Sequence, residues 1–547
     1  MIHSPADRWR AWFADSPLRE APFRDYYLGG LGVSLAFTMQ ATMAAWLMAT
    51  LTPSALMVAL VQTASTAPAL LLGLIAGALA DLFDRRRIIL ITQTLVLASL
   101  LLLGLTALLG LIGPGVLLLL TFIIGGAFLL ATPAQQASVN ELVSRDHLPR
   151  AVALGAVSFN MARAVGPALA GAIAALLGAG SAFLVAAACV LPFILVVRHW
   201  KVREPTLPGV PETLLSGVLS GLRFARHTPA MRALVIRNIT FCVAGASFWA
   251  LLPVIARDQL EMGAGGFGLL SAAFGLGAVA GALWIPRRLR RVDLDRVVTQ
   301  GVLLWIGAVV VVAASHIPAI ALIGALGVGV AWVSVLAGLS AGTQSTAPAW
   351  VRARAVSVTL VAVQASLALG SAWWGAVASA AGTQVALIAS AAAMLALRFV
   401  DRRFPVGLGS EAQVTTGVQL PDIAMAIEPM PHDGPVLVQL EYRIDPDNEA
   451  GFLRAIHAVE PTRRRNGAAS WRVYRDVGEA GRFVERFVIA SWAEYVRLRM
   501  RMTFADREIQ ERVALFQREG VPVRVSRLIG VNPEDAPPDE DRDSAIS

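Results

Sequence analysis

Two long stretches without a charged side chain most constrain what this chain can fold into. The first covers residues 26–80 and the second residues 88–140, and the charged segment 81–87 separates them. One helical crossing of a bilayer needs about 20 apolar residues, so each stretch is long enough for two crossings. The chain is therefore predicted to be a polytopic membrane protein, and the charged segment lies where a short loop must leave the bilayer.

The composition narrows the class of protein further. Hydrophobic residues make up 56% of the 547 residues and charged residues 15%, where a soluble chain carries about a quarter charged residues. The net charge is +8, but the arginines cluster at the ends of apolar segments, which favours cytoplasmic flanks of membrane helices over nucleic-acid binding. The single lysine, Lys201, precedes Val202, so the chain has no Walker A loop. Cys189 and Cys242 lie in apolar segments without metal-like spacing, and no metal or cofactor is expected.

Charges, glycines and prolines divide residues 25–400 into twelve predicted membrane helices. Their bounds are 25–51, 54–80, 88–110, 115–138, 151–177, 180–198, 233–256, 264–286, 297–314, 318–341, 355–378 and 381–399. Arginines gather on every second connection, and the other connections carry little charge. The arginine-rich side is expected to be cytoplasmic. With an even number of crossings, both termini are then cytoplasmic, including the segment 1–24.

A constant offset of 204 residues relates the two halves of this membrane part. It maps Gly77 onto Gly281, Arg150 onto Arg354, Gly166 onto Gly370 and Gly171 onto Gly375. The offset predicts two six-helix bundles, 25–198 and 233–400, joined by the cytoplasmic loop 199–232. Halves related in this way close on a substrate site near the middle of the bilayer and rock against one another.

One motif resembles the signature G-x-L-A-D-R-x-G-R-R/K of the major facilitator superfamily. It reads Gly77-Ala-Leu-Ala-Asp81-Leu-Phe-Asp84-Arg85-Arg86-Arg87, with Asp84 where the family usually has glycine. The resemblance implies an all-α fold of twelve transmembrane helices in two repeats and a gating role for the motif. Asp81 can accept hydrogen bonds at a neighbouring helix start and the arginines can pair across to the next loop, as in a latch that forms in one conformation. The alternative is a solvated turn, and the second half has Ile285 in place of Asp81.

The fifth span resembles the Gly-Pro motif that exporters of this superfamily carry. It reads Asn160-Met-Ala-Arg163-Ala-Val-Gly166-Pro167-Ala-Leu-Ala-Gly171. The glycines and the proline allow close packing and a kink. Arg163 lies roughly 20 Å along the helix from Arg150 at the cytoplasmic edge. An arginine at this depth is costly and faces a cavity or a partner. Two interpretations stay open: a role in substrate binding or gating, and structural pairing with carbonyl groups.

Four other residues at similar depth are candidates for lining a substrate cavity. They lie on the first, tenth and eleventh spans, which line the cavity in this superfamily: Gln40, Trp46, Trp332 and Gln364. Each alone is as well explained by packing, but together they suggest an amphipathic, mostly apolar cavity. The family implies protons as a coupling ion. Carboxylates are found only at the edges of the spans, namely Asp25, Asp81, Glu141, Asp258 and Glu261.

The pattern changes after the membrane part. A linker over 401–434 is followed by predicted strands at 436–442, 471–474, 483–489 and 523–529, and by helices within 448–465 and 491–516. The order β-α-β-β-α-β predicts a cytoplasmic α+β domain of ferredoxin-like topology over 435–530. The acidic segment 531–547 is predicted to be disordered.

This tail resembles that of bacterial exporters called transmembrane secretion effectors. The shared residues are Tyr442-Arg443, Arg463-Arg464-Arg465-Asn-Gly467, Trp471, Asp476, Ser491-Trp492-Ala-Glu494 and Arg501-Met-Thr503. Tyr495 and Arg499 stand where family tails often have histidines, which argues against metal or acid–base chemistry there. The tail is expected to regulate or dimerise the protein. Its topology is also that of small monooxygenase-like domains, so an enzymatic tail is the second hypothesis.

Together these features predict a secondary transporter in the bacterial inner membrane, not an enzyme. Its expected partners are the lipid bilayer and a small amphipathic substrate, such as a drug, a siderophore or a secondary metabolite, which it would export by alternating access. The alternative is a membrane-anchored sensor or enzyme whose helices only hold the tail.

Overall fold

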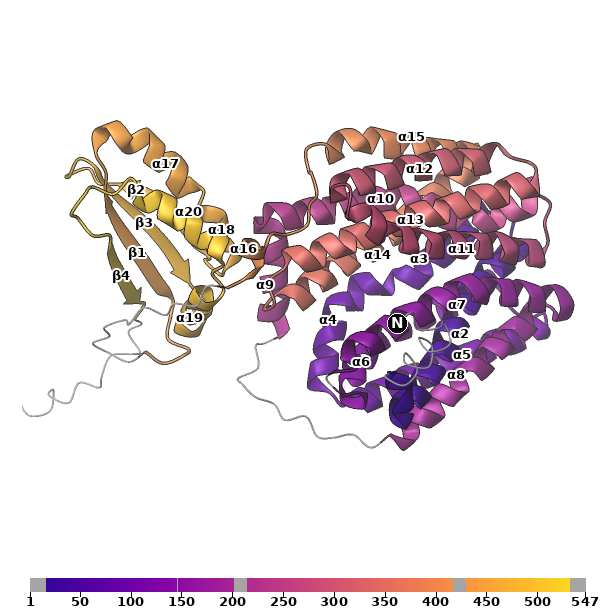
Figure 1. Ribbon diagram of the computed structural model, residues 1–547. Helices are drawn as coiled ribbons and strands as arrows, with labels where there is room; N and C mark the ends of the chain where they lie inside the picture. The colour runs from indigo at the N-terminus through magenta and orange to yellow at the C-terminus, as the bar shows by residue number, and fades with distance from the viewer. Residues whose placement is uncertain (1–15, 145, 201–213, 417–428, 532–547) are drawn as a thin grey trace, which may run out of the picture. The chain divides into compact units, whose positions relative to one another are not determined.

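The computed structural model describes residues 16–144, 146–200, 214–416 and 429–531 (Figure 1). Within them, twelve helices are long and apolar enough to cross a membrane, judged by length and composition. The start of the predicted cytoplasmic N-terminal segment, residues 1–15, and the segment predicted to be disordered, from residue 532 onward, lie outside the described residues. The contact pattern divides the chain into two compact bodies. The membrane body comprises Met1–Leu214, Ala233–Gly342 and Val356–Gly407, and the tail body comprises Leu215–Arg232, Thr343–Ala355 and Leu408–Ser547.

The first half of the membrane body follows the predicted spans closely. After the short η1 (Pro17–Arg19), its helices are α2 (Ala21–Leu51), α3 (Ala55–Thr66), α4 (Pro68–Leu82), α5 (Arg85–Leu108), α6 (Pro114–Leu142), α7 (Leu148–Leu177) and α8 (Ala179–His199). The second predicted span is two helices, α3 and α4. Pro68 starts α4 and has no N–H to continue the hydrogen-bond ladder of α3, which explains the break.

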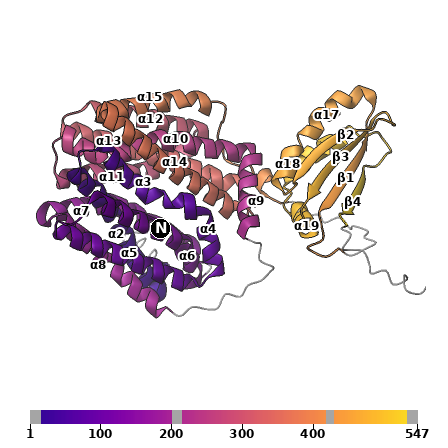
Figure 2. The ribbon, with the colours of Figure 1, turned by 180° about the vertical axis from the view of Figure 1, so that it is seen from behind.

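The second half repeats this order of helices. They are α10 (Pro229–Val254), α11 (Ala264–Leu289), α12 (Leu294–Ala314), α13 (Pro318–Thr346), α14 (Arg352–Ala381) and α15 (Thr383–Asp401). The π-helical turn η2 (Ile255–Gln259) extends α10 beyond Pro253, and the amide of Leu260 donates to the carbonyl of Ile255 at 3.0 Å. Figure 2 shows this half, in red and orange, beside the indigo and purple helices of the first half.

Glycines related by the 204-residue offset pack in equivalent places, which confirms the repeat. Gly166 on α7 faces α2, where an added Cβ would collide with Thr38, and Gly370 on α14 faces α10, where an added Cβ would lie 2.6 Å from the Val243 oxygen. Further along, Gly171 faces α11 and Gly375 faces α3. The first pair of contacts holds each half together, and the second joins the halves.

The described residues of the tail body form an antiparallel sheet and six short α-helices. The strands are β1 (Val436–Arg443), β2 (Ser470–Arg475), β3 (Arg482–Ile489) and β4 (Arg524–Ile529), in the order β2-β3-β1-β4. The helices are α9 (Leu214–His227), α16 (Glu411–Val414), α17 (Glu449–His457), α18 (Glu460–Arg465), α19 (Trp492–Met500) and α20 (Phe504–Ala514). The predicted β-α-β-β-α-β order is confirmed. The predicted helix over 448–465 is two helices, because Pro461 begins a new one.

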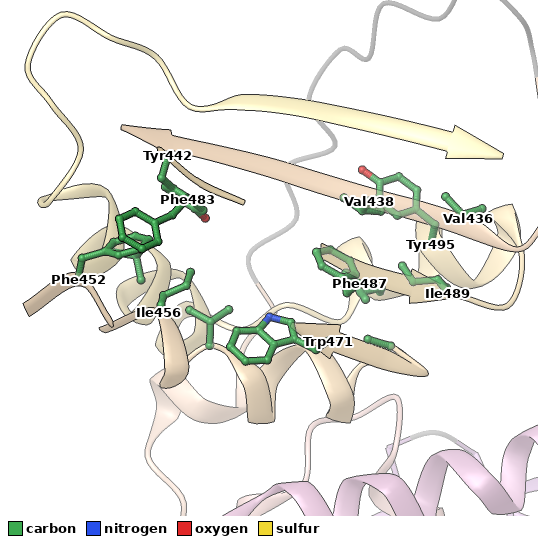
Figure 3. Close-up of a cluster of buried hydrophobic side chains, with 14 of the residues drawn as sticks. Val436, Val438, Tyr442, Phe452, Ile456, Trp471, Phe483, Phe487, Ile489 and Tyr495 are labelled. Atoms are coloured by element: carbon green, nitrogen blue, oxygen red, sulfur yellow. The ribbon is translucent and has the colours of Figure 1, made fainter. Parts of the chain in front are cut away.

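Helices cover one face of this sheet and form its core. Alternate residues of the strands point to this face and meet side chains of the helices (Figure 3). The buried set is Val436, Val438, Tyr442, Ile444, Phe452, Ile456, Val459, Ala468, Trp471, Phe483, Phe487, Ile489, Tyr495, Leu498 and Val513. All of these residues lie within residues 436–513. The α+β part of the tail therefore has a hydrophobic core made entirely of its own residues.

Candidate functional site

Arg163 lies near the middle of α7, where this helix crosses α11. Its guanidinium carbon is 5.8 Å from the centroid of the Phe159 ring on α7 and 5.9 Å from that of the Phe274 ring on α11. Both distances are in the range of cation–π contacts. The helices approach closely here, because a Cβ added to Gly275 would lie 2.7 Å from the Arg163 carbonyl oxygen. Since α7 belongs to the first half and α11 to the second, the guanidinium lies where the halves meet.

The contacts of this guanidinium are unusual for a cation inside a membrane helix. Across the part of the chain that the structure describes, its contacts are with ring faces, and no carboxylate or carbonyl is paired with it. The residue is half-buried, so part of its surface stays open to contact. The structural interpretation of Arg163 requires carbonyl partners, and the described residues supply none.

Aromatic rings continue from Arg163 into both halves. On the first-half side, Phe159 lies 6.5 Å from Phe128, which stacks on Phe37 at 4.0 Å. On the second-half side, Phe274 meets Trp249 edge to face at 4.3 Å, and Trp249 lies 6.2 Å from Trp332. We call these six rings the aromatic row: Phe37, Phe128, Phe159, Phe274, Trp249 and Trp332. The row places one cation between two sets of π faces.

The structure separates the four predicted cavity residues. Trp332 belongs to the aromatic row. Trp46 stacks on Phe267 of α11 at 5.7 Å, which places it at the contact between the halves but outside the row. Gln40 is buried within the first half, and Gln364 is half-buried on α14. The aromatic residues Phe159, Phe274 and Trp249 were not selected from the sequence, since phenylalanine in an apolar helix carries no local signal of a site.

Gln40 faces a small cavity inside the first half, whose lining is mostly apolar and includes Phe37 and Phe128. Its Nε2 donates to Thr121 Oγ1 at 3.3 Å, and its Oε1 has no described partner. The Nε2 and Oε1 atoms of the buried Gln93 also have no hydrogen-bond partner among the described residues. Both glutamines line a cavity of about 10 Å³, which is about the space that one water molecule needs. This cavity is too small for a substrate.

The exporter motif brings α7 into close contact with α2 in the first half and with α11 in the second half. Thr38 Oγ1 donates to the carbonyl of Ala162 at 3.0 Å, next to the place where α2 passes Gly166. At Gly171, an added Cβ would lie 2.8 Å from Gly268 Cα on α11. Pro167 lies inside the helix and is buried, and Asn160 is half-buried one turn before Arg163. The motif thus fixes the backbone that carries the arginine.

The gating motif forms contacts within the first half. Arg85 pairs with Glu141 at the end of α6 at 2.5 Å, as predicted for pairing across to the next loop. Arg86 donates to the carbonyl groups of Val197 and Arg198 at the end of α8. Asp84 caps α5 by accepting from the Arg86 amide at 2.9 Å, and its second oxygen lies 3.6 Å from the exposed Arg87. The surroundings of Gly77 and of the Asp81 side chain are outside what the structure describes.

A buried charge cluster in the second half was missed by the sequence predictions. Arg237 on α10, only 2% exposed, lies 3.6 Å from the carboxylate of Asp401 and 3.3 Å from that of Asp295. Thr240 donates to Asp401 at 2.9 Å, and Arg398 lies 3.5 Å from it. The sequence contained a sign of this cluster, because Arg237 is a charged residue inside the apolar span predicted for residues 233–256.

The tail motif converges on a second buried carboxylate, Glu485, which is fully buried in β3. Its oxygens accept from Arg463 Nε and Trp471 Nε1, both at 2.9 Å, and from the Tyr442 hydroxyl at 3.1 Å. Burial lowers the pKa of the Arg463 guanidinium, but the charge of Glu485 and its hydrogen bond, together with the nearby tyrosines, outweigh this and hold that pKa above its usual value. Burial, then the charge of Glu485, raises the pKa of Tyr442, which stays a hydrogen-bond donor.

Other residues of the tail motif also make structural contacts. Ser491 caps α19 by accepting from the Glu494 amide, and Thr503 forms a capping box with Asp506 on α20. At the positions of the family histidines, the hydroxyl of the buried Tyr495 accepts from Arg527 at 2.6 Å. Within the described residues no group of three His, Cys, Asp or Glu side chains could hold a metal ion.

The tail body also includes two segments that precede the α+β part in the sequence. Arg501, just after the end of α19, lies 4.5 Å over the ring of Trp350, and Arg465 on α18 lies 6.0 Å over the ring of Phe224 on α9. Phe224 and Trp350 in turn meet edge to face at 6.2 Å. No helix was predicted in the loop 199–232, so the sequence analysis missed α9 and its contacts.

Comparisons with known proteins place the whole chain. A family model described as transmembrane secretion effector matches residues 13–535. The multidrug efflux pump Tap of Mycolicibacterium fortuitum is 30% identical over 370 residues, which cover 65% of this chain and 88% of that protein. The staphyloferrin A transporter of Staphylococcus aureus is 26% identical and the enterobactin exporter EntS of Shigella flexneri 29% identical. These two matches cover 46% and 47% of this chain, and 63% and 58% of the relatives' own lengths.

Solved transporter structures share the fold of the membrane part. A bacterial homologue of the human lysosomal transporter Spinster, inward-facing and occupied, superposes with a TM-score of 0.59 over 71% of this chain and 98% of that one, at 15% identity. The nucleoside transporter NupG gives a TM-score of 0.55 over 70% of this chain and 98% of that one, at 16% identity. These relatives and neighbours are transporters rather than enzymes. With its twelve apolar helices and its tail, the chain belongs to the transmembrane secretion effector family of major facilitator exporters.

Proposed function

We propose that this protein exports a small amphipathic molecule by alternating access of its two halves around Arg163. The observation that supports this most directly is the aromatic row, which runs from α2 through Arg163 to α13 and so takes side chains from both halves. Apolar walls with a few polar groups suit an amphipathic ligand. The similarity to drug and siderophore transporters supports the same substrate range.

Contacts between the halves support an inward-facing state. Several of them lie at the helix ends that join the arginine-poor connections, whereas Gly73 on α4 packs against Val361 on α14 nearer the arginine-rich connections. The amide of Leu56, near the start of α3, donates to Ser379 Oγ at 2.9 Å, and Arg257 donates to the Thr52 carbonyl at 3.2 Å. Gly171 and Gly268 pack at the equivalent ends of α7 and α11. If the arginine-poor side is external, these contacts close the external end of the transport path.

Flux measurements test the proposal. The purified protein in liposomes should move at least one of three amphipathic dyes faster than empty liposomes do: the anion 8-anilinonaphthalene-1-sulfonate, the neutral N-phenyl-1-naphthylamine, or the cation ethidium. Imposed gradients of pH and of membrane potential supply the driving force. If no dye moves under any gradient, and the tail alone turns over a substrate, the alternative of a membrane-anchored enzyme is favoured instead.

We include proton coupling in the proposal on the strength of the family. Two of the edge carboxylates are paired with a neighbouring arginine on the surface, Asp25 with Arg24 and Asp258 with Arg257. Asp401 differs, because it is 4% exposed and inside the membrane body. Flux driven by a pH gradient should therefore be more sensitive to Asp401→Asn than to Asp258→Asn. Equal sensitivity of the two variants would count against a role of Asp401 in proton coupling.

The latch remains part of the proposal. Arg85 and Arg86 tie α5 to α6 and α8, so the first half moves as a unit when the latch is formed. Asp81 would complete it, and Asp81→Asn should slow transport at unchanged membrane insertion. Wild-type flux in this variant would remove the latch from the mechanism.

The orientation and the role of the tail are also proposals. Arginine asymmetry supports a location in the bacterial inner membrane with both termini in the cytoplasm. A cysteine at either terminus should then be labelled only after cell lysis. The edge strands β2 and β4 and the uncovered sheet face, with Tyr474 47% and Leu528 53% exposed, support dimerisation through the tail. Light scattering of the isolated α+β part tests this, and a monomer at all concentrations would contradict it.

A further inference from the structure

Arg163 differs from two other buried arginines in this chain. Arg237 pairs with the carboxylates of Asp295 and Asp401, and Arg463 pairs with that of Glu485. Arg163 has only the faces of Phe159 and Phe274 in the described residues. A cation–π contact compensates only part of what a guanidinium loses when it leaves water. The cation at the meeting point of the halves is therefore electrostatically incomplete without a further anionic partner.

The surroundings also define the shape of that partner. Phe159 and Phe274 place one ring from each half within 6 Å of the guanidinium, and Trp249 continues the row at 4.3 Å from Phe274. Phe159 and Trp249 are half-buried, like Arg163, so parts of these rings are open to contact. Ring faces and edges favour stacked or edge-to-face contacts with another flat ring. The partner should carry a planar aromatic group next to its negative charge.

We propose that the substrate is an aromatic anion whose carboxylate or sulfonate binds Arg163 while its ring packs against the partly exposed rings of Phe159 and Trp249. The fully buried Phe274 supports the guanidinium from within the protein. This inference rests on the proposed transport function and specifies its substrate class. A fork of N–H donors suits an oxyanion with two oxygens, which a lysine ammonium would bind less specifically. A cationic substrate would meet like charge at the same place. The order of preference is anion, then neutral molecule, then cation.

Two dyes with nearly the same aromatic skeleton test the charge preference. 8-Anilinonaphthalene-1-sulfonate is an aromatic anion, and N-phenyl-1-naphthylamine lacks its sulfonate. Their fluorescence is titrated with the full-length protein in nanodiscs, and the signal of empty nanodiscs is subtracted. In the wild-type protein the anion should bind saturably and more tightly. Arg163→Met should weaken binding of the anion at least about tenfold, since a charge-assisted contact is lost, and leave binding of the neutral dye unchanged.

Three further variants separate binding from structure. Arg163→Lys should retain part of the preference for the anion. Phe159→Leu should weaken binding of both dyes, because the partly exposed Phe159 ring contacts the aromatic part of each dye. Arg290→Met, at the end of α11 and far along the helix from the aromatic row, is the matched control and should change neither affinity.

The results that would overturn the inference are specific. An Arg163→Met protein that binds the anion as tightly as the wild type, or that loses both dyes equally, assigns Arg163 a structural role. Absence of saturable binding of the anion to the wild type also contradicts the inference. Because the measurement is equilibrium binding, it is independent of flux. A protein that binds the anion through Arg163 but moves no dye in liposomes leaves the substrate class intact and refutes the transport proposal.

Discussion

Arg163 in the membrane body is half-buried and Arg463 in the tail is buried, and the partners of the two guanidinium groups differ. Arg463 lies 4.7 Å over the Phe487 ring and also has a bidentate contact with Glu485, at 2.9 and 3.4 Å. Arg163 has two rings and no described carboxylate. In the tail the counter-charge is built into the fold, so the arginine serves stability. Between the halves the described residues supply no counter-charge to Arg163, and in our proposal a ligand supplies it.

The largest expected effect concerns the paired arginine. Glu485→Gln keeps the volume of the side chain but leaves Arg463 buried without its counter-charge, which should destabilise the tail by about 3–5 kcal/mol. Thermal unfolding of residues 429–531, followed by circular dichroism, measures this, since the core of this part consists of its own residues. The double variant Arg463→Met and Glu485→Leu should recover only part of the loss, because Trp471 and Tyr442 lose the acceptor of their hydrogen bonds. A stable single variant would mean that the pair is dispensable and would weaken the comparison.

A smaller loss is expected at the paired arginine of the membrane body. Arg237→Met removes one of the two arginines that lie beside the buried carboxylate of Asp401, which keeps Thr240 at 2.9 Å and Arg398 at 3.5 Å among the described residues. Because part of the network remains, the cost should be about 2–3 kcal/mol, below that of Glu485→Gln. Thermal inactivation of the detergent-solubilised protein, followed by size-exclusion chromatography, gives the shift. A variant as stable as the wild type would show that this cluster does not hold α10 to α15.

The surface pairs of the tail should matter less and should depend on pH. Burial raises the pKa of the Glu441 carboxyl, but the hydrogen bond with Arg482 and its charge, with smaller contributions from Gln439 and Arg524, together bring the pKa below its ordinary value. A carboxyl with a depressed pKa in the folded state stabilises the fold above its unfolded pKa, and this contribution disappears as the pH falls through the folded pKa. Glu441→Gln should therefore lower the melting temperature slightly at neutral pH and not at strongly acidic pH. An equal difference at both values would contradict the ion pair.

The smallest effect on stability is expected at Arg163. Arg163→Met removes an unpaired cation and keeps a long apolar side chain between Phe159 and Phe274, so the protein should be as stable as the wild type or slightly more stable. The same thermal assay as for Arg237 applies. A loss as large as that of Arg237→Met would reveal a structural partner of Arg163 and would end the distinction between the two kinds of arginine.

Much of the fold was predictable because it depends on local patterns. Hydropathy and arginine placement predicted the helices, and alternation predicted the strands, with bounds that differ from the observed ones by a few residues. Glu485 could have been recognised by the same rule, since it alternates with Phe483 and Phe487 on the inward face of β3. The sequence analysis predicted the strand but did not assign Glu485 to either face, although its burial follows from its position in the strand.

The pairing of distant residues was not predictable. Asp401 meets Arg237 across 164 residues, and nothing local in either segment indicates the other. The rings beside Arg163 come from separate helices in both halves, so only the depth of the arginine was visible in advance. The repeat offset did predict which glycines lie in equivalent crossings. An internal repeat allows contacts in one half to be inferred from the other half. The cluster around Arg237 was not related to the first half by the repeat, so it could not be inferred in this way.

The tail body is assembled from three separate pieces of chain, and this affects the order in which it can form during synthesis. The ribosome makes α9 and Thr343–Ala355 well before the strands of the sheet. Phe224, which is 1% exposed in the finished body, can gain its contacts with Arg465 only after the tail has left the ribosome. A chain that stops short of the tail leaves this apolar ring uncovered. The last segment to be synthesised therefore determines whether chaperones and proteases meet a finished protein or an incomplete one.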